Sequence, residues 1–169
     1  MPTRWLPFEL HPDTPLEGAP KPFSDEQWPA IDRRLRTLAR QVGVPIEPPR
    51  RNANSRLALE TGELVRARGG DESSAAFHHD VSRAFFVEGA DIGDLQVIAN
   101  HAAPFGVSED DLRAAWTSHA YAGAIDASMR AARAAGVTGV PAFGWPESRA
   151  VSGMMEPQQI VAILQGSAR

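Results

Sequence analysis

The sequence predicts an α/β protein in which a small sheet is interrupted by a long helical insertion. An extended segment opens the chain, apolar residues at helical spacing follow for about a hundred residues, and a hairpin pattern with one more helix closes it. The 169 residues, 43% of them hydrophobic, are enough for one compact domain with a lobe inserted into it. We expect a single domain of this kind.

The first element is a short strand over Thr3–Leu10. Apolar residues dominate this segment, and the proline-rich run His11–Pro15 stops it. Pro7 lies inside the segment and has no N–H to donate to a neighbouring strand. We therefore expect the strand to end early or to have one free side near Pro7.

A succession of helices is expected next. Pro29 fits the first helix only if it lies in the first turn, and Ser108 has the features of an N-cap ahead of three acidic residues. The apolar faces of these helices begin with Trp28, Leu57, Phe77, Leu95, Leu112 and Ile125. Their stop signals are Gly43, Gly69-Gly70, Gly89, Pro104 and Gly136.

The stretch Gly136–Phe143 is expected to return the chain to the sheet. Gly136 can end a helix in the left-handed conformation, and Pro141 restricts Val140 to extended geometry. Composition alone leaves the Val140–Pro141 bond open between cis and trans, since about 5% of such bonds are cis. A hairpin of residues 142–145 with 149–152, and a helix starting at Pro157, should follow.

Composition excludes several classes of function. No cysteine is present, so the chain has no disulfide, no thiolate metal site and no thiol chemistry of its own. The net charge of −4 argues against a nucleic-acid surface. No run approaches the ~20 apolar residues that cross a bilayer, and no secretory signal is recognisable, so we expect a cytoplasmic protein without a membrane partner.

Metal sites and nucleotide motifs are not indicated. His78 and His79 are adjacent and lack a second histidine four residues on, so we interpret both as surface residues. No Gly-rich phosphate-binding fingerprint occurs. We expect no metal and no resident cofactor.

Five segments, in this order and spacing, resemble one known family. They are Trp5–Leu10, Asn54–Leu59, Ala84–Ile92, Gly139–Phe143 and Val151–Gly153. They are spread from residue 5 to residue 153 and resemble the DsbA-like thioredoxin-fold family, FrnE type, a resemblance that extends over essentially the whole chain. This family is related to 2-hydroxychromene-2-carboxylate isomerases and kappa-class glutathione transferases.

The resemblance implies a thioredoxin-like fold with a helical insertion. A partial thioredoxin-like domain would comprise residues 1–15 and 136–169, and the inserted helical domain residues 16–135. Gly139, Val140 and Pro141 would form a cis-proline loop that pairs with the backbone of a thiol-containing peptide or of glutathione. Asn54 would face the same groove, although a helix cap explains an asparagine there equally well.

One departure from the family is severe. The sequence begins at what would be the second strand, without the first strand and the helix that carries Cys-x-x-Cys, so we expect no catalytic residue in this chain. The serine that isomerase and transferase relatives use would lie in the same segment. The missing neighbour strand should also leave an exposed edge, which leads us to expect low stability or association, for example as a homodimer.

Three hypotheses for function remain open. The first is a DsbA-family thiol-disulfide oxidoreductase homologue, truncated and redox-inactive as given. The second is a glutathione-dependent isomerase or transferase relative, with glutathione as cosubstrate. The third is a noncatalytic module that binds an extended peptide in the groove at Val140–Pro141.

Overall fold

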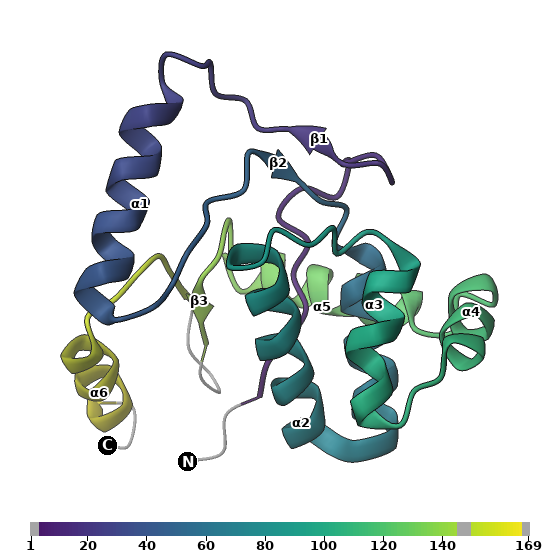
Figure 1. Cartoon of the computed structure of the whole chain (residues 1–169). Helices are drawn as coiled ribbons and strands as arrows, with labels where there is room; N and C mark the ends of the chain where they lie inside the picture. Colours follow the sequence, from purple (N-terminus) through teal and green to yellow (C-terminus); the bar gives the residue numbers. More distant parts are fainter. Residues whose placement is uncertain (1–3, 145–149, 167–169) are drawn as a thin grey trace.

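The computed structural model describes residues 4–144 and 150–166 (Figure 1). Its strands are β1 (Ala19–Pro20), β2 (Arg51–Asn52), β3 (Ala142–Phe143) and β4 (Val151–Ser152). Its helices are α1 (Trp28–Val42), α2 (Arg56–Phe86), α3 (Leu95–Ala102), α4 (Glu109–Thr117), α5 (Ala122–Ala134) and α6 (Pro157–Gly166), with one 3-10 turn, Ala103–Phe105. The expected order of helices, hairpin and final helix is confirmed.

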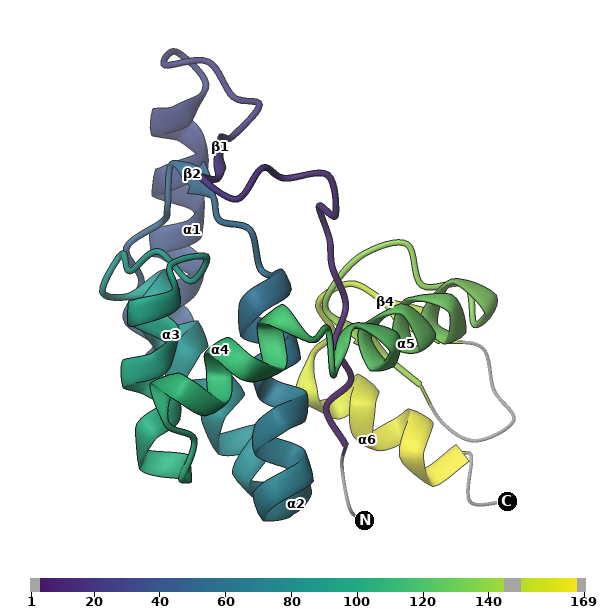
Figure 2. The same ribbon diagram turned by 90° about the vertical axis from the view of Figure 1, so that its right-hand side faces the viewer.

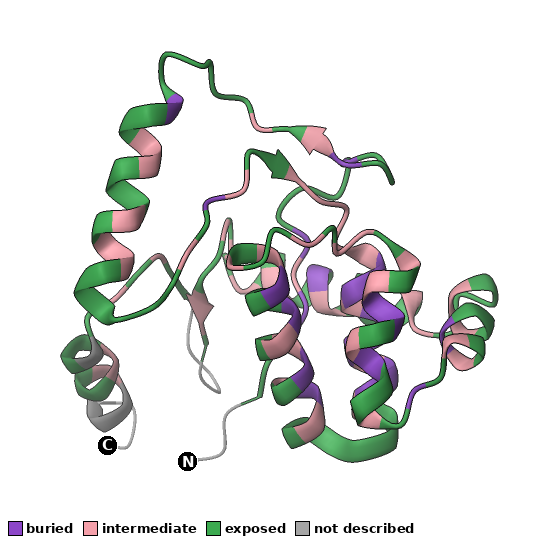
Figure 3. Ribbon diagram, in the orientation of Figure 1, coloured by how far each residue is buried: buried purple, intermediate pink, exposed green. Residues whose placement is uncertain are grey.

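The main core lies among α2, α3 and α4. Their inward faces are buried, as the purple segments of Figure 3 show. The core consists of Leu57, Ala58, Leu64, Val65, Phe77, Val81, Ile98, Ala99, Ala102, Val107 and Leu112. Phe77 packs edge-on against the ring of Phe105, with 5.8 Å between the ring centroids. The helical periodicity of the sequence thus identifies the right faces.

Helix α2 is two helical arms joined at Gly70. The φ of +78° at this residue is left-handed, and the chain reverses there, so the expected stop is real although the helix resumes at once. The two arms approach closely at Gly62, where an added Cβ would lie 2.7 Å from the His78 ring. The Ser74 hydroxyl donates to the Gly62 carbonyl, 3.1 Å away. His78 is therefore half-buried between the arms, which corrects its assignment as a surface residue.

Side-chain caps define the starts of α3 and α4. The Asp94 carboxylate accepts from the Val97 N–H at 2.9 Å. The Ser108 hydroxyl accepts from the Asp111 N–H, and the Asp111 carboxylate accepts in return from the Ser108 N–H. This reciprocal capping box confirms Ser108 as the N-cap.

The strands form two small antiparallel pairs. One pair is the predicted hairpin, in which Ala142 lies opposite Ser152 and Phe143 opposite Val151. Trp145 and Arg149, the ends of the predicted strands next to the turn, lie outside the described residues. The other pair joins β1 to β2, which the sequence did not indicate. Pro20 and Arg51 are opposite each other in it. No described strand links the two pairs.

The expected strand over Thr3–Leu10 is wrong for its described part. Residues 4–10 form no strand and run instead beside α5. The Ser128 hydroxyl donates to the Pro7 carbonyl at 2.8 Å, and the Glu9 N–H points to the Met129 sulfur at 3.0 Å. A strand needs a neighbouring strand, and side chains of α5 satisfy this backbone in its place.

Helices α1 and α6 lie at the outside of the molecule (Figures 1 and 2). Pro29 occupies the first turn of α1, as predicted, and Trp28 is the one buried residue of that helix. In α6, Val161 is 50% exposed. No helix of the described residues is both long and apolar enough to cross a membrane.

Candidate functional site

The loop between α5 and β3 contains three of the four predicted site residues. Gly136 ends α5 with a φ of +83°, and the Val137 N–H returns to the Ala132 carbonyl at 2.9 Å. The chain then runs through Gly139 to the Val140–Pro141 peptide bond, which is cis. The Pro141 carbonyl accepts from the Gly153 N–H at 2.8 Å. The loop is thus fixed on both sides, by α5 and by the turn after β4.

Val140 is open to solvent within this fixed loop. It is 51% exposed, and neither its N–H nor its carbonyl bonds to another described backbone or side-chain group. An added Cβ on Gly139 would touch nothing within 4 Å. Because a residue before proline is held extended, Val140 presents a short extended backbone whose N–H and carbonyl bond to no described group.

Asn54, the fourth predicted site residue, is bonded within the chain. Its amide nitrogen donates to the Thr14 carbonyl at 2.7 Å, and its amide oxygen accepts from the Arg56 N–H at 3.0 Å. Ser55 is the N-cap of α2, but its side chain makes no capping bond. Asn54 therefore ties the segment after residue 10 to the start of α2. It shares no described cavity with the loop at Val140.

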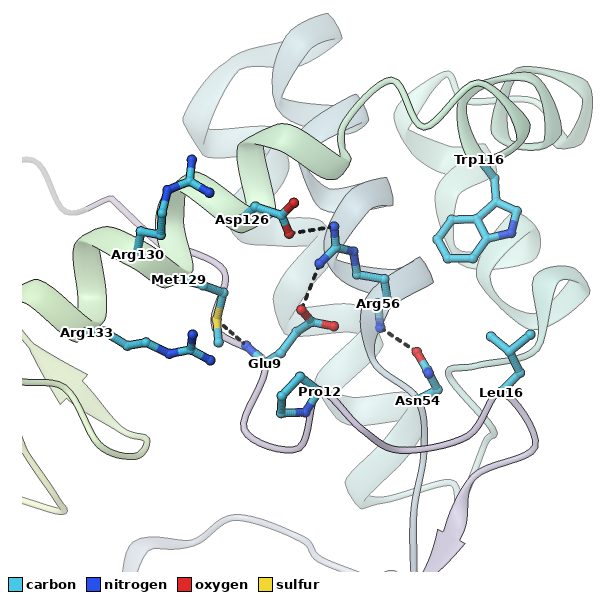
Figure 4. Close-up of a pocket in the computed structure, with 10 residues that line it drawn as sticks. All are labelled: Glu9, Pro12, Leu16, Asn54, Arg56, Trp116, Asp126, Met129, Arg130 and Arg133. Carbon is cyan, nitrogen blue, oxygen red and sulfur yellow. Dashed lines mark hydrogen bonds and ion pairs between the residues drawn. The ribbon is translucent and has the colours of Figure 1, made fainter.

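A cavity of about 500 Å³ lies between the N-terminal segment, the start of α2 and α5 (Figure 4). Its lining residues are Glu9, Pro12, Leu16, Asn54, Arg56, Trp116, Asp126, Met129, Arg130 and Arg133. Apart from Asn54, the sequence did not indicate any of them as site residues.

Arg56 joins the three walls of this cavity. Its guanidinium contacts Glu9 at 2.8 Å, Glu60 at 2.6 Å and Asp126 at 2.9 Å. It also donates to the Ala122 carbonyl at 3.1 Å. Burial lowers the pKa of Arg56, but the hydrogen bonds to the three carboxylates outweigh burial and raise the pKa above its ordinary value. Arg56 is therefore a permanent cation that fixes the segment at Glu9 against α2 and α5.

One of these contacts had a signal in the sequence. Arg56 and Glu60 are four residues apart on a helix, a spacing that favours an ion pair. Glu9 and Asp126 lie 47 and 70 residues away from Arg56 along the chain, and only the fold brings them together.

Metal-binding geometry is not found in the described part of the chain. No group of three histidine, aspartate or glutamate side chains there is arranged to hold an ion. His101 contacts Asp80, with 2.7 Å between Nδ1 and the carboxylate oxygen, and so links α3 to α2. This pair joins two helices and no further ligand group accompanies it.

A family model described as the DSBA-like thioredoxin domain matches residues 2–165. A comparison with curated protein sequences found no relative.

Several solved structures are similar to this one, among them the following three. A protein from Streptomyces coelicolor described as a probable DsbA oxidoreductase is 26% identical, with a TM-score of 0.79 over 94% of this chain and 72% of its own. A 2-hydroxychromene-2-carboxylate isomerase is 22% identical, with a TM-score of 0.66 over 85% of this chain and 66% of its own. A candidate protein disulfide isomerase from Nitrosomonas europaea is 17% identical, with a TM-score of 0.64 over 89% of this chain and 79% of its own. The last two likenesses concern the fold alone.

Proposed function

Because the chain belongs to the family of DSBA-like thioredoxin domains, we propose that it is a thiol-disulfide oxidoreductase homologue that binds thiol substrates without exchanging disulfides by itself. Its thioredoxin-like α/β fold class is the one expected from the sequence. The FrnE type within the family remains a prediction. The substrate class proposed is an extended peptide with a cysteine.

The observation that carries the proposal is the free backbone of Val140. Its N–H and carbonyl have no partner among the described residues, and the loop around it is held by α5 and by Gly153. A peptide can pair with such a backbone as an added strand, which gives affinity through main-chain hydrogen bonds. A preformed loop lowers the entropy lost on binding.

The redox part of the proposal rests on the residue types present. Disulfide exchange needs a thiolate that attacks a disulfide sulfur, and the 169 residues contain no cysteine. The thiol must therefore come from the bound molecule or from a group outside these residues. We expect the chain to leave the rate of insulin reduction by dithiothreitol at its background value.

Two substitutions of Val140 test the binding mode. Val140→Pro removes the N–H that would donate to the peptide, whereas Val140→Ala keeps the N–H and shortens the side chain. The fluorescence anisotropy of a fluorescein-labelled cysteine peptide measures the affinity. We expect Val140→Pro to bind at least tenfold more weakly than wild type, because one lost hydrogen bond costs ~1 kcal/mol and the block to strand pairing costs more. Val140→Ala should bind within about threefold of wild type.

The control for these two variants is their unfolding temperature, which reports whether the fold is intact. Both variants should unfold at the wild-type temperature, because the Val140 N–H makes no bond in the described structure. If Val140→Pro binds the peptide as tightly as Val140→Ala does, the backbone of Val140 is not the binding element and the proposal is wrong.

A second candidate is a glutathione-dependent isomerase relative. The likeness in fold to 2-hydroxychromene-2-carboxylate isomerase and the lack of a protein thiol favour it, because glutathione would bring the thiol. Glutathione and the labelled peptide would then compete for the same loop. If glutathione at millimolar concentration leaves peptide anisotropy unchanged, this candidate is excluded for the loop at Val140.

A further inference from the structure

The cavity beside α5 is a second place where the molecule can hold a ligand. Its volume of about 500 Å³ falls in the range of ~300–1,000 Å³ that is usual for small-molecule sites. None of residues 139–141 lines it, so an inference about this cavity is independent of the peptide-binding loop.

The two acidic groups of the cavity wall are already paired. Glu9 and Asp126 each contact the guanidinium of Arg56, at 2.8 and 2.9 Å. Arg56 in turn shares its donors with the buried Glu60. This cluster is an internal network, and its charges are directed mainly at one another.

Two more arginines of α5 line the cavity, and their side chains point in different directions in Figure 4. Arg130 and Arg133 are three residues apart, so they lie on one side of the helix, and both are exposed. Within residues 4–144 and 150–166, no ion pair involves either of them. Figure 4 shows Arg133 extending toward the part of the cavity where Met129 and Glu9 lie. No described carboxylate therefore competes with an anion for these two guanidinium groups.

We propose that this cavity binds a small organic acid whose carboxylate is held by Arg133, with Arg130 adding positive charge at the rim. The planar fork of a guanidinium matches the two oxygens of a carboxylate. Met129 lies beside Arg133 in Figure 4 and supplies apolar wall for the hydrocarbon part of such a ligand, and Leu16 and Trp116 line the cavity on the other side of Arg56. The Asn54 amide is bonded within the chain and is left out of the recognition.

Charge balance sets how strong this binding is. The lining carries three arginines and two carboxylates, and Glu60, which pairs with Arg56, adds a third carboxylate. These charges sum to zero, so the position of the arginines, and not an excess of positive charge, attracts the anion. Because both arginines are exposed, salt screens the attraction over ~10 Å at 0.1 M. The affinity should fall as salt is raised.

Nuclear magnetic resonance of the Trp116 indole N–H gives a local test. We expect succinate to shift this signal in a saturable way, whereas putrescine, a dication of similar length, leaves it in place. The Trp116→Phe variant assigns the signal. In the double variant Arg130→Ala/Arg133→Ala the succinate affinity should fall at least tenfold.

A double variant of the same charge on α1 is the matched control. Arg33→Ala/Arg34→Ala also removes two exposed arginines, but neither lines the cavity. It should bind succinate with wild-type affinity. Equal weakening in both double variants would assign the effect to net charge and overturn the proposal, as would an unchanged affinity in Arg130→Ala/Arg133→Ala or no succinate shift at all.

Discussion

The helical region of α2–α5 and the sheet region of β3, β4 and α6 differ sharply in burial. In the first, Phe77, Ile98 and Ile125 are 0% exposed. In the second, Val151 is 38% and Val161 is 50% exposed, and no described residue of β3 or β4 is buried. The region that carries the proposed peptide-binding loop is thus the one with the least core.

This contrast assigns different tasks to the two regions. Full burial of a large apolar side chain stabilises a protein by ~1.5–3 kcal/mol, and a half-exposed one contributes much less. We therefore attribute most of the stability to the helices, and we expect the sheet region to open locally at a lower free energy. Backbone that is easily opened and not fully paired is also backbone that a ligand can pair with.

Core substitutions should give the largest effects and the clearest test of this division. Phe77→Ala leaves a cavity in the helical core next to Phe105, so we expect a loss of ~3–5 kcal/mol in the free energy of unfolding. Val161→Ala in α6 should cost less than ~1 kcal/mol, because the side chain is 50% exposed. Urea denaturation followed by circular dichroism measures both. Equal losses would mean that the two regions share the stability evenly.

The link between the N-terminal segment and the helices depends on Arg56. Arg56→Met leaves Glu9 and Glu60 without their cationic partner, and both are less than 10% exposed. We expect a loss of ~3 kcal/mol, as for other broken buried ion pairs. Arg113→Met, on the exposed pair with Glu109 in α4, is the control and should cost ~0–1 kcal/mol. If both variants unfold at the same urea concentration, Arg56 does not hold the segment.

A smaller, pH-dependent effect should mark the helical region. Burial first, and then the charge of Arg66, lower the pKa of His78, while Glu63 opposes the shift. The folded imidazole stays neutral at pH values where the unfolded one is protonated, so stability is complete above about pH 6.5 and declines as the pH falls below it.

Unfolding temperatures of wild type, His78→Gln and His79→Gln at pH 5 and pH 7.5 check this. The loss on acidification should be smaller in His78→Gln than in wild type. The exposed neighbour His79 is the matched control, and its variant should behave as wild type does. An equal loss in all three proteins would show that other groups cause the pH dependence.

The sequence was most informative where the structure depends on neighbours along the chain. Pro29 in a first turn, the Ser108 cap and the stop at Gly136 are local events within a few residues, and all three are found as expected. Apolar spacing also identified Phe77 and Leu112 as core.

Contacts between distant segments were the part that the sequence could not give. The short pair of Ala19–Pro20 with Arg51–Asn52 and the ion pair of Glu9 with Arg56 both depend on how the whole chain is arranged. The strand over Thr3–Leu10 failed for the same reason, since its apolar pattern does not say whether a neighbouring strand exists. The loop at Val140 was indicated by its glycines and proline, whereas its binding role came from the family resemblance and stays a prediction.

Hydrogen exchange with and without a cysteine peptide tests the central claim most directly, namely that a peptide pairs with the loop at Val140 and not with the helices. We predict that the peptide slows exchange at Gly139, Val140, Ala142 and Phe143 and leaves the amides of α2–α5 unchanged. Protection confined to the helices, or no change at residues 139–143 in a peptide-bound sample, would contradict it.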